Sequence, residues 1–297
     1  MILRKGRIYL LMHKDSAKAG LCLAICIFAS SSTRALAQAS KERDTAQQHI
    51  QSGQEAYSKQ AYNVAIGEFK KAQSMDKKLT EPYLMLAWAY RAERRYKEAL
   101  KSAGQAIKLR PNYPDAHFLM ARLYFETNNA RKSKQELDIA VGQGAANANV
   151  HILQADLRLL NKDYEGAVKE YDEAVALADS KDEGLPLVRE RADGLKNYIE
   201  FKKDREHSSI TFPVLKNLPM PNYTEEARKK GIQGIVKEIA LVDENGHIRY
   251  VLVLSGLGYG LDEEAVLATK KLDFKPATKD GQPVAFWVNM EVEFNLR

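Results

Sequence analysis

The residue types that could support covalent or metal chemistry are few in this sequence and poorly grouped. The two cysteines, Cys22 and Cys26, both lie in an N-terminal apolar segment, so the rest of the chain has no thiol. No serine, histidine and aspartate stand in a catalytic motif, and no phosphate loop is present. Gly256, Gly258 and Gly260 lack the spacing of a dinucleotide site and are expected to form a flexible bend. The sequence therefore indicates a protein that is not an enzyme and needs no cofactor or metal.

The charge distribution argues against a nucleic-acid partner. The 297-residue chain has a formal net charge of +6, but residues 1–37 contain six Lys or Arg and one Asp. The remainder carries 39 positive and 38 negative charges, so it is nearly neutral. A protein that binds nucleic acid usually concentrates its positive charge on the folded part, which is not the pattern here.

The N-terminal segment has the layout of an export signal. Fourteen uncharged residues from Ala19 to Ser32 follow two lysines and precede the small-residue pattern Ala35-Leu36-Ala37. As a helix this stretch is about 21 Å long, which is short of the ~30 Å hydrocarbon core of a membrane. We expect cleavage after Ala37 or Ala39. An uncleaved inner-membrane anchor is the alternative, a lipoprotein fits less well because large residues precede both cysteines, and the start codon is Met1 or Met12.

A 34-residue period runs from residue 46 to residue 181. Small residues recur at three phases of this period, and large residues such as Tyr90 and Tyr124 recur at others. Small residues at a fixed phase are typical of helices that cross closely, whereas large residues fill the space between the crossings. Each period therefore predicts a helical hairpin. The three small series are Gly53, Ala87, Ala121 and Ala155; Ala65, Ala99, Ser133 and Ala167; and Ala72, Ala106, Ala140 and Ala174.

These hairpins resemble tetratricopeptide repeats. The best copy, residues 80–113, has Tyr83, Leu86, Ala87 and Tyr90 in its first helix and ends at Pro111. The resemblance covers four units over 46–181, and an amphipathic helix within 182–206 is expected to close the last one. His117 and His151 recur in the column of Tyr83, so we interpret them as packing residues rather than metal ligands.

The resemblance implies a right-handed superhelix whose concave groove binds a peptide or another protein. Aromatic rings interleaved with arginines suit an extended peptide that carries a carboxylate. Each of these aromatic residues could instead pack between neighbouring units. The positions that the resemblance places in the groove are Tyr57, Trp88, Arg91, Phe118, Arg122 and Phe125.

Past residue 206 the pattern changes to β-branched runs separated by turn signals. After a linker at 207–218, a short helix is expected over 223–230, with Thr224 as its N-cap and Gly231 as its end. Strands are expected over 235–243 and 248–255, joined by a turn at Asn245-Gly246, and a helix over 261–272. The last strand, 285–296, alternates apolar residues such as Phe286 with more polar ones.

The stretches PNYTEEARKKGIQGIV, DENGHI, GLGYGLDEEAV and DFKPATKDGQPV, followed by the closing strand, resemble the TonB C-terminal domain over 219–297. The fold class expected is thus α+β multidomain: an all-α superhelix followed by a small α+β domain with an antiparallel sheet. The family binds outer-membrane TonB-dependent receptors by adding a receptor segment to a sheet edge. The resemblance implies an edge formed by Val288, Asn289, Met290, Glu291, Val292, Glu293 and Phe294, and a contact loop formed by Met220, Pro221, Asn222 and Tyr223.

Two functions fit these patterns. The first is a periplasmic TonB-like protein, in a Gram-negative-type cell envelope, that supports energised transport. If the N-terminal segment stays uncleaved, this protein is anchored in the inner membrane and meets an energising complex there. The second is an exported adaptor that links two partners without transmitting energy. The proline-rich spacer of a typical TonB is missing, and the repeats occupy its place.

Overall fold

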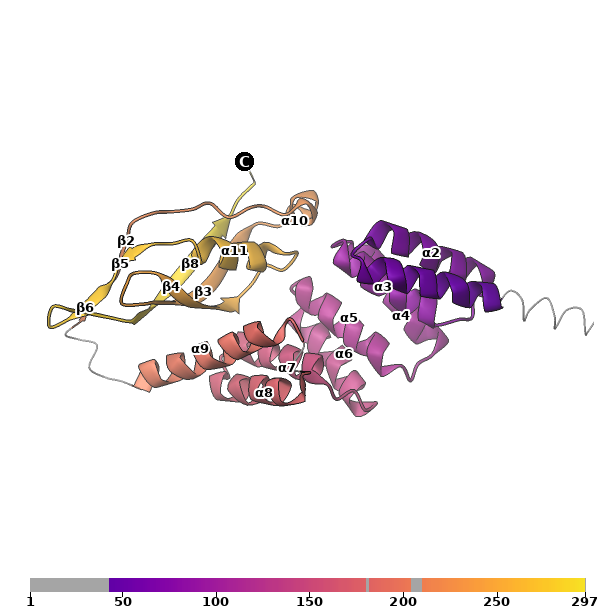
Figure 1. Cartoon of the computed structure of the whole chain (residues 1–297), viewed down its shortest axis with the longest axis horizontal. Coiled ribbons are helices and arrows are strands. Elements are labelled where there is room, and N and C mark those ends of the chain that lie inside the picture. The colour runs from indigo at the N-terminus through magenta and orange to yellow at the C-terminus, as the bar shows by residue number, and fades with distance from the viewer. Residues whose placement is uncertain (1–42, 180–181, 204–209, 297) are drawn as a thin grey trace, which may run out of the picture.

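The computed structural model describes residues 43–179, 182–203 and 210–296. Its helical part leads into a β-rich part that lies against the last helices (Figure 1). The predicted export signal at 1–37 lies outside the described residues. Within the described residues, no helix has both the length and the apolar character needed to cross a membrane.

The helical part is a series of hairpins, and a short turn joins the two helices of each hairpin. The first helix among the described residues covers 43–58. The following helices are α2 (Tyr62–Met75), α3 (Glu81–Ala92), α4 (Tyr96–Leu109), α5 (Pro114–Glu126), α6 (Ala130–Gly142), α7 (Ala148–Leu160), α8 (Tyr164–Leu177) and α9 (Leu185–Lys203).

The turn within each hairpin has the same backbone geometry. A residue with positive φ occurs in every turn, although none of the four is glycine, and the four positions are spaced 34 apart. This conformation is unfavourable for residues with a side chain, so packing of the two helices must impose it. The four residues are Gln60, Arg94, Asn128 and Lys162.

The small residues of the 34-residue period lie at the helix crossings. All members of the Ala65 and Ala72 series are buried. At Gly53 the crossing is so close that a Cβ atom would lie 2.5 Å from the ring of Phe69. The prediction that these columns mark close helix contacts is confirmed.

Three hairpins also share an internal pair between a histidine and a glutamate. Each histidine in the column of Tyr83 contacts a glutamate 19 residues later, through Nδ1 at 2.6 to 2.8 Å. The second hairpin has Tyr83 instead, whose hydroxyl donates to the carbonyl of Lys77. These histidines therefore link the two helices of a hairpin. The pairs are His49 with Glu68, His117 with Glu136, and His151 with Glu170.

The β-rich part is built on a three-stranded antiparallel sheet of order β4-β3-β8. The chain enters it through α10 (Glu225–Lys230), whose N-cap is Thr224 and whose C-cap is Gly231 at φ 65°. The strands are β3 (Gly234–Val242), β4 (Ile248–Ser255) and β8 (Phe286–Phe294), and α11 (Leu261–Thr269) follows β4. The hairpin turn needs Gly246, at φ 89°, because a Cβ there would meet the carbonyl oxygen of Phe274.

The segment predicted as a linker, 207–218, is instead partly built into the β-rich part. β1 (Ile210–Thr211) pairs with β6 (Ala277–Lys279), and β2 (Val214–Leu215) pairs with β5 (Phe274–Lys275). β6 also pairs with β7 (Gln282–Val284). The β-rich part therefore starts before Pro219. These strands of two or three residues are too short to produce an alternating pattern in the sequence.

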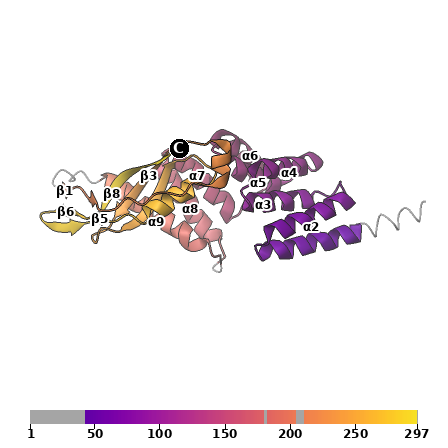
Figure 2. The same cartoon turned by 90° about the horizontal axis from the view of Figure 1, so that it is seen from above.

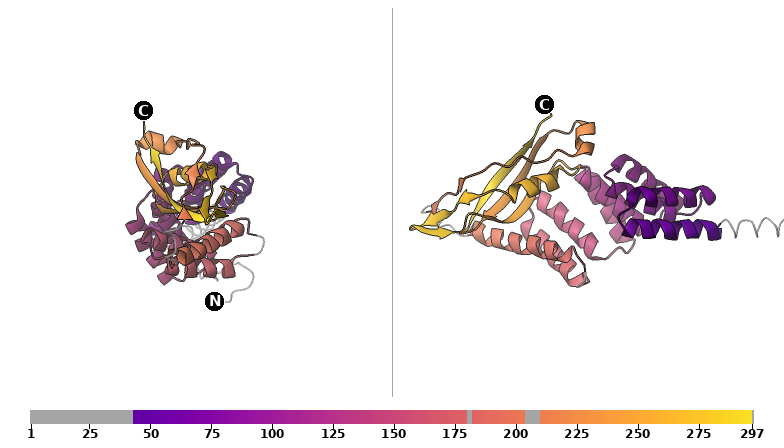
Figure 3. Two further views of the ribbon diagram at one scale, coloured as in Figure 1. Left: turned by 90° about the vertical axis from the view of Figure 1, so that its left-hand side faces the viewer. Right: turned by 45° about the horizontal axis from the view of Figure 1, so that its top comes forward.

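The central sheet has a different neighbour on each face. One face packs on α11 and on Leu272 and Phe274. The other face packs on the end of the helical array, as Figures 2 and 3 show from two further directions. Ile239, Leu252 and Trp287 of the sheet belong to the same apolar cluster as residues of α7, α8 and α9.

This shared cluster fixes the sheet against the helices. Leu195 and Tyr198 of α9 are buried in it, and Trp287 is only 5% exposed. The Trp287 indole N–H donates to Asn197 at 2.8 Å, and its ring stacks on Tyr250. Burial of several large apolar side chains at this junction stabilises the docked arrangement by roughly 1.5–3 kcal/mol per side chain.

A carboxylic acid is buried on the opposite face of the sheet. Glu238 of β3 is 1% exposed, and one of its oxygens accepts a hydrogen bond from the Thr269 hydroxyl at 2.6 Å. Its other oxygen has no hydrogen-bond partner among the described residues. Burial raises the pKa of Glu238 to about 7.

The close helix crossings predict a selective effect of Ala106→Phe. Because Ala106 is fully buried, the larger side chain should lower the free energy of unfolding by about 1–3 kcal/mol. Lys108→Phe, at an exposed position of the same helix, should change it by less than about 0.5 kcal/mol. Urea unfolding measures the free energy of unfolding of both variants. If Ala106→Phe is as stable as Lys108→Phe, the helix crossing tolerates a bulky side chain.

The buried acid predicts a pH dependence of stability. The folded state holds the Glu238 proton up to about pH 7, whereas the unfolded chain releases it near 4.5. The contribution of protonated Glu238 to the free energy of unfolding is therefore complete below pH 4.5. It is lost as the pH rises towards 7, which lowers the free energy of unfolding by an amount on the order of 3 kcal/mol.

Urea unfolding at several pH values should show this slope weakened in Glu238→Gln. Glu291→Gln, at an exposed position of β8, should retain the slope of the parent. If the stability of Glu238→Gln depends on pH as strongly as that of the parent, Glu238 is not the source of this pH dependence.

Candidate binding sites

β8 forms one edge of the central sheet. In the described residues it pairs with β3 along its length and with no strand on its outer side. Asn289, Glu291 and Glu293 are exposed. They lie on the same face of the sheet as Trp287, which packs against the helices. Lys237 of β3 lies 3.4 Å from Glu291. The outer main-chain groups of β8 are thus placed where another strand could pair with them.

The apolar side chains of β8 point to the other face of the sheet. Val288, Met290 and Val292 are half-buried, and Phe294 is buried. Phe294 therefore offers main-chain groups at the edge, while its ring belongs to the core beneath α11.

The predicted contact loop divides into an exposed part and a structural part. Met220 is 82% exposed, and Asn222 donates to Glu264 at 3.1 Å. Tyr223 packs edge-to-face on Phe294, and its hydroxyl donates to the carbonyl of Ile232. Met220 is thus free to contact a partner, whereas Tyr223 holds the loop to the sheet.

The predicted groove arginines are already paired within the chain. Arg91 contacts Glu126 at 2.5 Å and Arg122 contacts it at 2.9 Å. Burial alone would raise the pKa of Glu126, but the two guanidinium groups hold it below its ordinary value. A peptide carboxylate would have to compete with Glu126 for these arginines.

The predicted groove aromatics are not equivalent. Phe118 is buried with Leu137 and Leu153 between hairpins, so it does not line an open groove. It faces this core because α5 places it on the side towards α6 and α7. Trp88 and Phe125 are half-buried at the margin of this cluster. Tyr57 is half-buried and packs on Tyr62 at 5.3 Å between ring centroids.

The glycine-rich segment predicted to be a flexible bend contacts the helical array. The amide of Tyr259 donates to the carbonyl of Glu126 at 2.7 Å, and its ring packs edge-to-face on Tyr96. Gly258 has φ 72°, and a Cβ there would lie 2.6 Å from the Glu126 carbonyl oxygen. Glycine is therefore required for this close approach. The segment is a docking loop that fits against the turn after α5.

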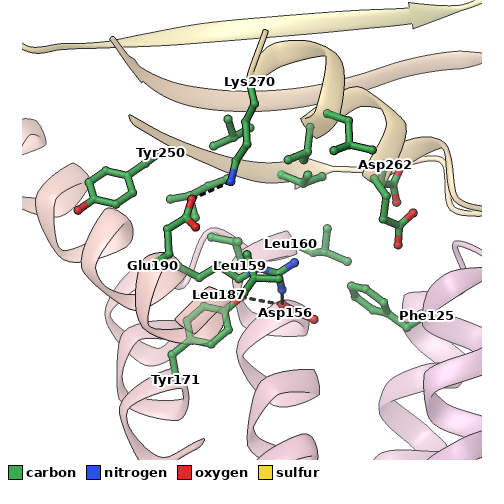
Figure 4. Close-up of a pocket in the computed structure, with 18 of the residues that line it drawn as sticks. Phe125, Asp156, Leu159, Leu160, Tyr171, Leu187, Glu190, Tyr250, Asp262 and Lys270 are labelled. Carbon is green, nitrogen blue, oxygen red and sulfur yellow. Dashed lines mark hydrogen bonds and ion pairs between the residues drawn. The ribbon is translucent and has the colours of Figure 1, made fainter. Parts of the chain in front are cut away.

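A cavity of about 380 Å³ lies between the sheet and the helical array (Figure 4). Apolar residues from both parts line it, including Phe125, Leu159 and Leu252. In Figure 4, α11 and the strands lie above the opening and the helices of the array lie below it. Its volume is in the range of small-ligand pockets in proteins.

A buried polar network forms the floor of this cavity. Asp156 is 8% exposed and accepts from the Tyr171 hydroxyl at 2.6 Å and from Arg191 at 3.2 Å. Arg122 lies 3.6 Å from the same carboxylate. Burial and the neighbouring Asp156 raise the pKa of Tyr171 well above its ordinary value. The network ties α5, α7, α8 and α9 together beneath the sheet.

Sequence reasoning missed this cavity, although the sequence contained a signal for it. Asp156 lies 34 residues after Arg122, and Leu159 lies 34 residues after Phe125. The predicted groove columns thus continue into the fourth hairpin, and both of these residues line the cavity. The lining from β4 and α11 could not be found from the period, because it comes from another part of the chain.

Comparisons with known proteins identify the two parts. The family model of the Gram-negative bacterial TonB protein C-terminal matches residues 219–296, and a tetratricopeptide repeat model matches residues 90–157. Protein TonB of Vibrio cholerae is 38% identical over 77 residues, which are 26% of this chain and 32% of that protein. Protein TonB of Xanthomonas campestris is 38% identical over 82 residues, 27% of this chain and 37% of that protein. The chain thus spans about a third of the length of these relatives.

Solved structures similar to this chain include a tetratricopeptide repeat protein and a fragment of MamA. The first, from Parabacteroides merdae, is 18% identical, covers 51% of this chain and 58% of its own, and has a TM-score of 0.45. The MamA fragment from Desulfovibrio magneticus is 21% identical and has a TM-score of 0.42. The match covers 54% of this chain and 93% of the fragment. This α+β chain therefore contains tetratricopeptide repeats, matched over residues 90–157, and after them a TonB-type C-terminal domain, matched over residues 219–296.

Proposed function

We propose that the protein binds periplasmic segments of outer-membrane TonB-dependent receptors by strand addition at β8, in support of energised transport. The observation that carries this proposal is the outer side of β8, which no strand covers in the described residues. The match of the domain to TonB proteins supports the choice of partner.

The physical basis of this binding is main-chain pairing. An edge strand presents unpaired N–H and C=O groups, which accept a partner strand of varied sequence. An added strand would lie about 4.8 Å from β8. Exposed Asn289, Glu291 and Glu293 would lie beside its side chains, and Met220 is exposed in the predicted contact loop.

The proposed location is the periplasm of a Gram-negative-type cell. If residues 1–37 remain uncleaved, the protein is anchored in the inner membrane and meets an energising complex there. Sequencing the N-terminus of the protein from fractionated cells separates these cases, since cleavage leaves a chain that starts at Gln38 or Ser40.

A second candidate function is that of a non-energised adaptor. It is favoured by the shared apolar cluster, which joins the repeats directly to the TonB-type domain. In this function the first hairpins, with Tyr57 and Trp88, bind a second partner while β8 binds the first. Both candidate functions use the same β8 edge.

Strand addition predicts that proline, introduced at one of two neighbouring positions of β8, abolishes binding. N–H groups alternate in direction along a strand, so those of Asn289 and Glu291 point to one side and that of Met290 points to the other. Proline is tolerated where the N–H faces outward and disrupts the sheet where the N–H pairs with β3. We therefore expect one of the two variants, Asn289→Pro or Met290→Pro, to keep the parent's melting temperature. That variant should lose binding to receptor segments.

Fluorescence anisotropy with labelled receptor segments measures this binding, and alanine at the same position should leave it nearly unchanged. Circular dichroism and thermal melting identify the folded proline variant. If that variant binds receptor segments as strongly as the parent, strand addition at β8 is wrong.

A further inference from the structure

The opposite edge of the sheet, formed by β4, opens into the cavity between the two parts. Four consecutive residues of β4, from Tyr250 to Val253, line this cavity. Side chains alternate between the two faces of a strand, so consecutive residues line one cavity together at the strand's edge. In the described residues β4 pairs with β3 on its inner side and with no strand on its outer side.

Apolar side chains stand on both sides of this edge. Val266 and Leu267 of α11 line the cavity together with Leu159, Leu160 and Leu187 of the helical array. The ion pair between Lys270 and Glu190 joins the two parts at 2.9 Å. Leu267 is 52% exposed and Leu187 is 48% exposed, so large apolar side chains reach solvent on both sides of the cavity. The repeats therefore form a second apolar wall that the isolated sheet would not have.

The charges of the cavity leave a negative excess. Its lining contains three cations and four carboxylates. Lys270 pairs with Glu190 at 2.9 Å, and Arg191 pairs with Asp156 at 3.2 Å. The carboxylates at the start of α11, Asp262 and Glu263, contact no cation at ion-pair distance among the described residues, and Asp262 accepts main-chain N–H groups. Glu263 is thus the lining carboxylate with which a basic group would pair, and the Arg94 guanidinium lies close by, beside Gly260 at the start of α11.

We propose that the cavity is a second strand-addition site, which binds an extended apolar peptide segment that carries a basic residue. Its main chain pairs with the outer edge of β4. Alternate side chains pack against α11 on one side and against the repeats on the other, and the basic side chain lies near Glu263. The proposal is independent of the function of β8, because the two edges lie on opposite sides of β3.

A synthetic peptide tests the proposal on the whole protein. The probe is fluorescein-labelled Ser-Val-Leu-Arg-Val-Leu-Arg-Ser, and its binding is followed by fluorescence anisotropy. Leu267→Arg, which places a cation and a bulky side chain at the cavity, should weaken binding at least about tenfold. Leu177→Arg is the matched control, since Leu177 is 53% exposed on α8 and does not line the cavity. It should leave the dissociation constant within about twofold of the parent's.

Two further comparisons separate main-chain pairing at β4 from other binding. Of two probes methylated at alternate peptide nitrogens, the one with methyl groups facing β4 should bind at least about tenfold more weakly. The folded proline variant of β8 should bind the unmethylated probe like the parent. The proposal is overturned if the probe shows no saturable binding, if Leu267→Arg and Leu177→Arg bind it equally, or if the β8 variant alone loses binding.

Discussion

The structure depends on the apolar cluster that joins the TonB-type sheet to the last repeat helices. Trp287, Leu252 and Ile239 from the sheet pack with Leu195 and Tyr198 of α9. Because a sheet face must be buried against another element, these contacts decide which face turns towards the repeats. The docking loop at Tyr259 adds a second point of attachment, at the turn after α5. The two attachments hold the repeats and the sheet in one arrangement.

This arrangement gives the two edges of the sheet different surroundings. β8 lies on the outer side, with exposed polar residues such as Glu291, whereas β4 lines a cavity walled by α11 and the repeats. The outer edge suits a partner whose side chains remain in solvent, and the inner edge suits one whose side chains are apolar. The repeats therefore contribute an apolar wall in the fourth hairpin, while Arg91 and Arg122 are engaged with Glu126.

Patterns that repeat along the chain were predictable from the sequence, and contacts between its two parts were not. The 34-residue period located the hairpins, and alternation located β3, β4 and β8, because each signal reports local packing. Trp287 alternates with polar Asn289 and Glu291, so nothing local marked it as the centre of the junction. Gly258 appeared to serve flexibility, but it permits a close contact with Glu126, more than a hundred residues earlier in the chain. Such contacts depend on tertiary packing, which a periodic pattern does not encode.

The fluorescence of Trp287 tests the docked arrangement most directly. The chain has two tryptophans, so Trp88→Phe leaves Trp287 as the single reporter. A docked sheet predicts blue-shifted emission and weak quenching by acrylamide, because Trp287 is buried against α9. Adding Leu195→Arg and Tyr198→Arg should shift the emission to the red while circular dichroism still reports a folded sheet. Red-shifted, strongly quenched emission in the Trp88→Phe protein itself would contradict the account, because Trp287 would then lie in solvent and the sheet would stand apart from the repeats.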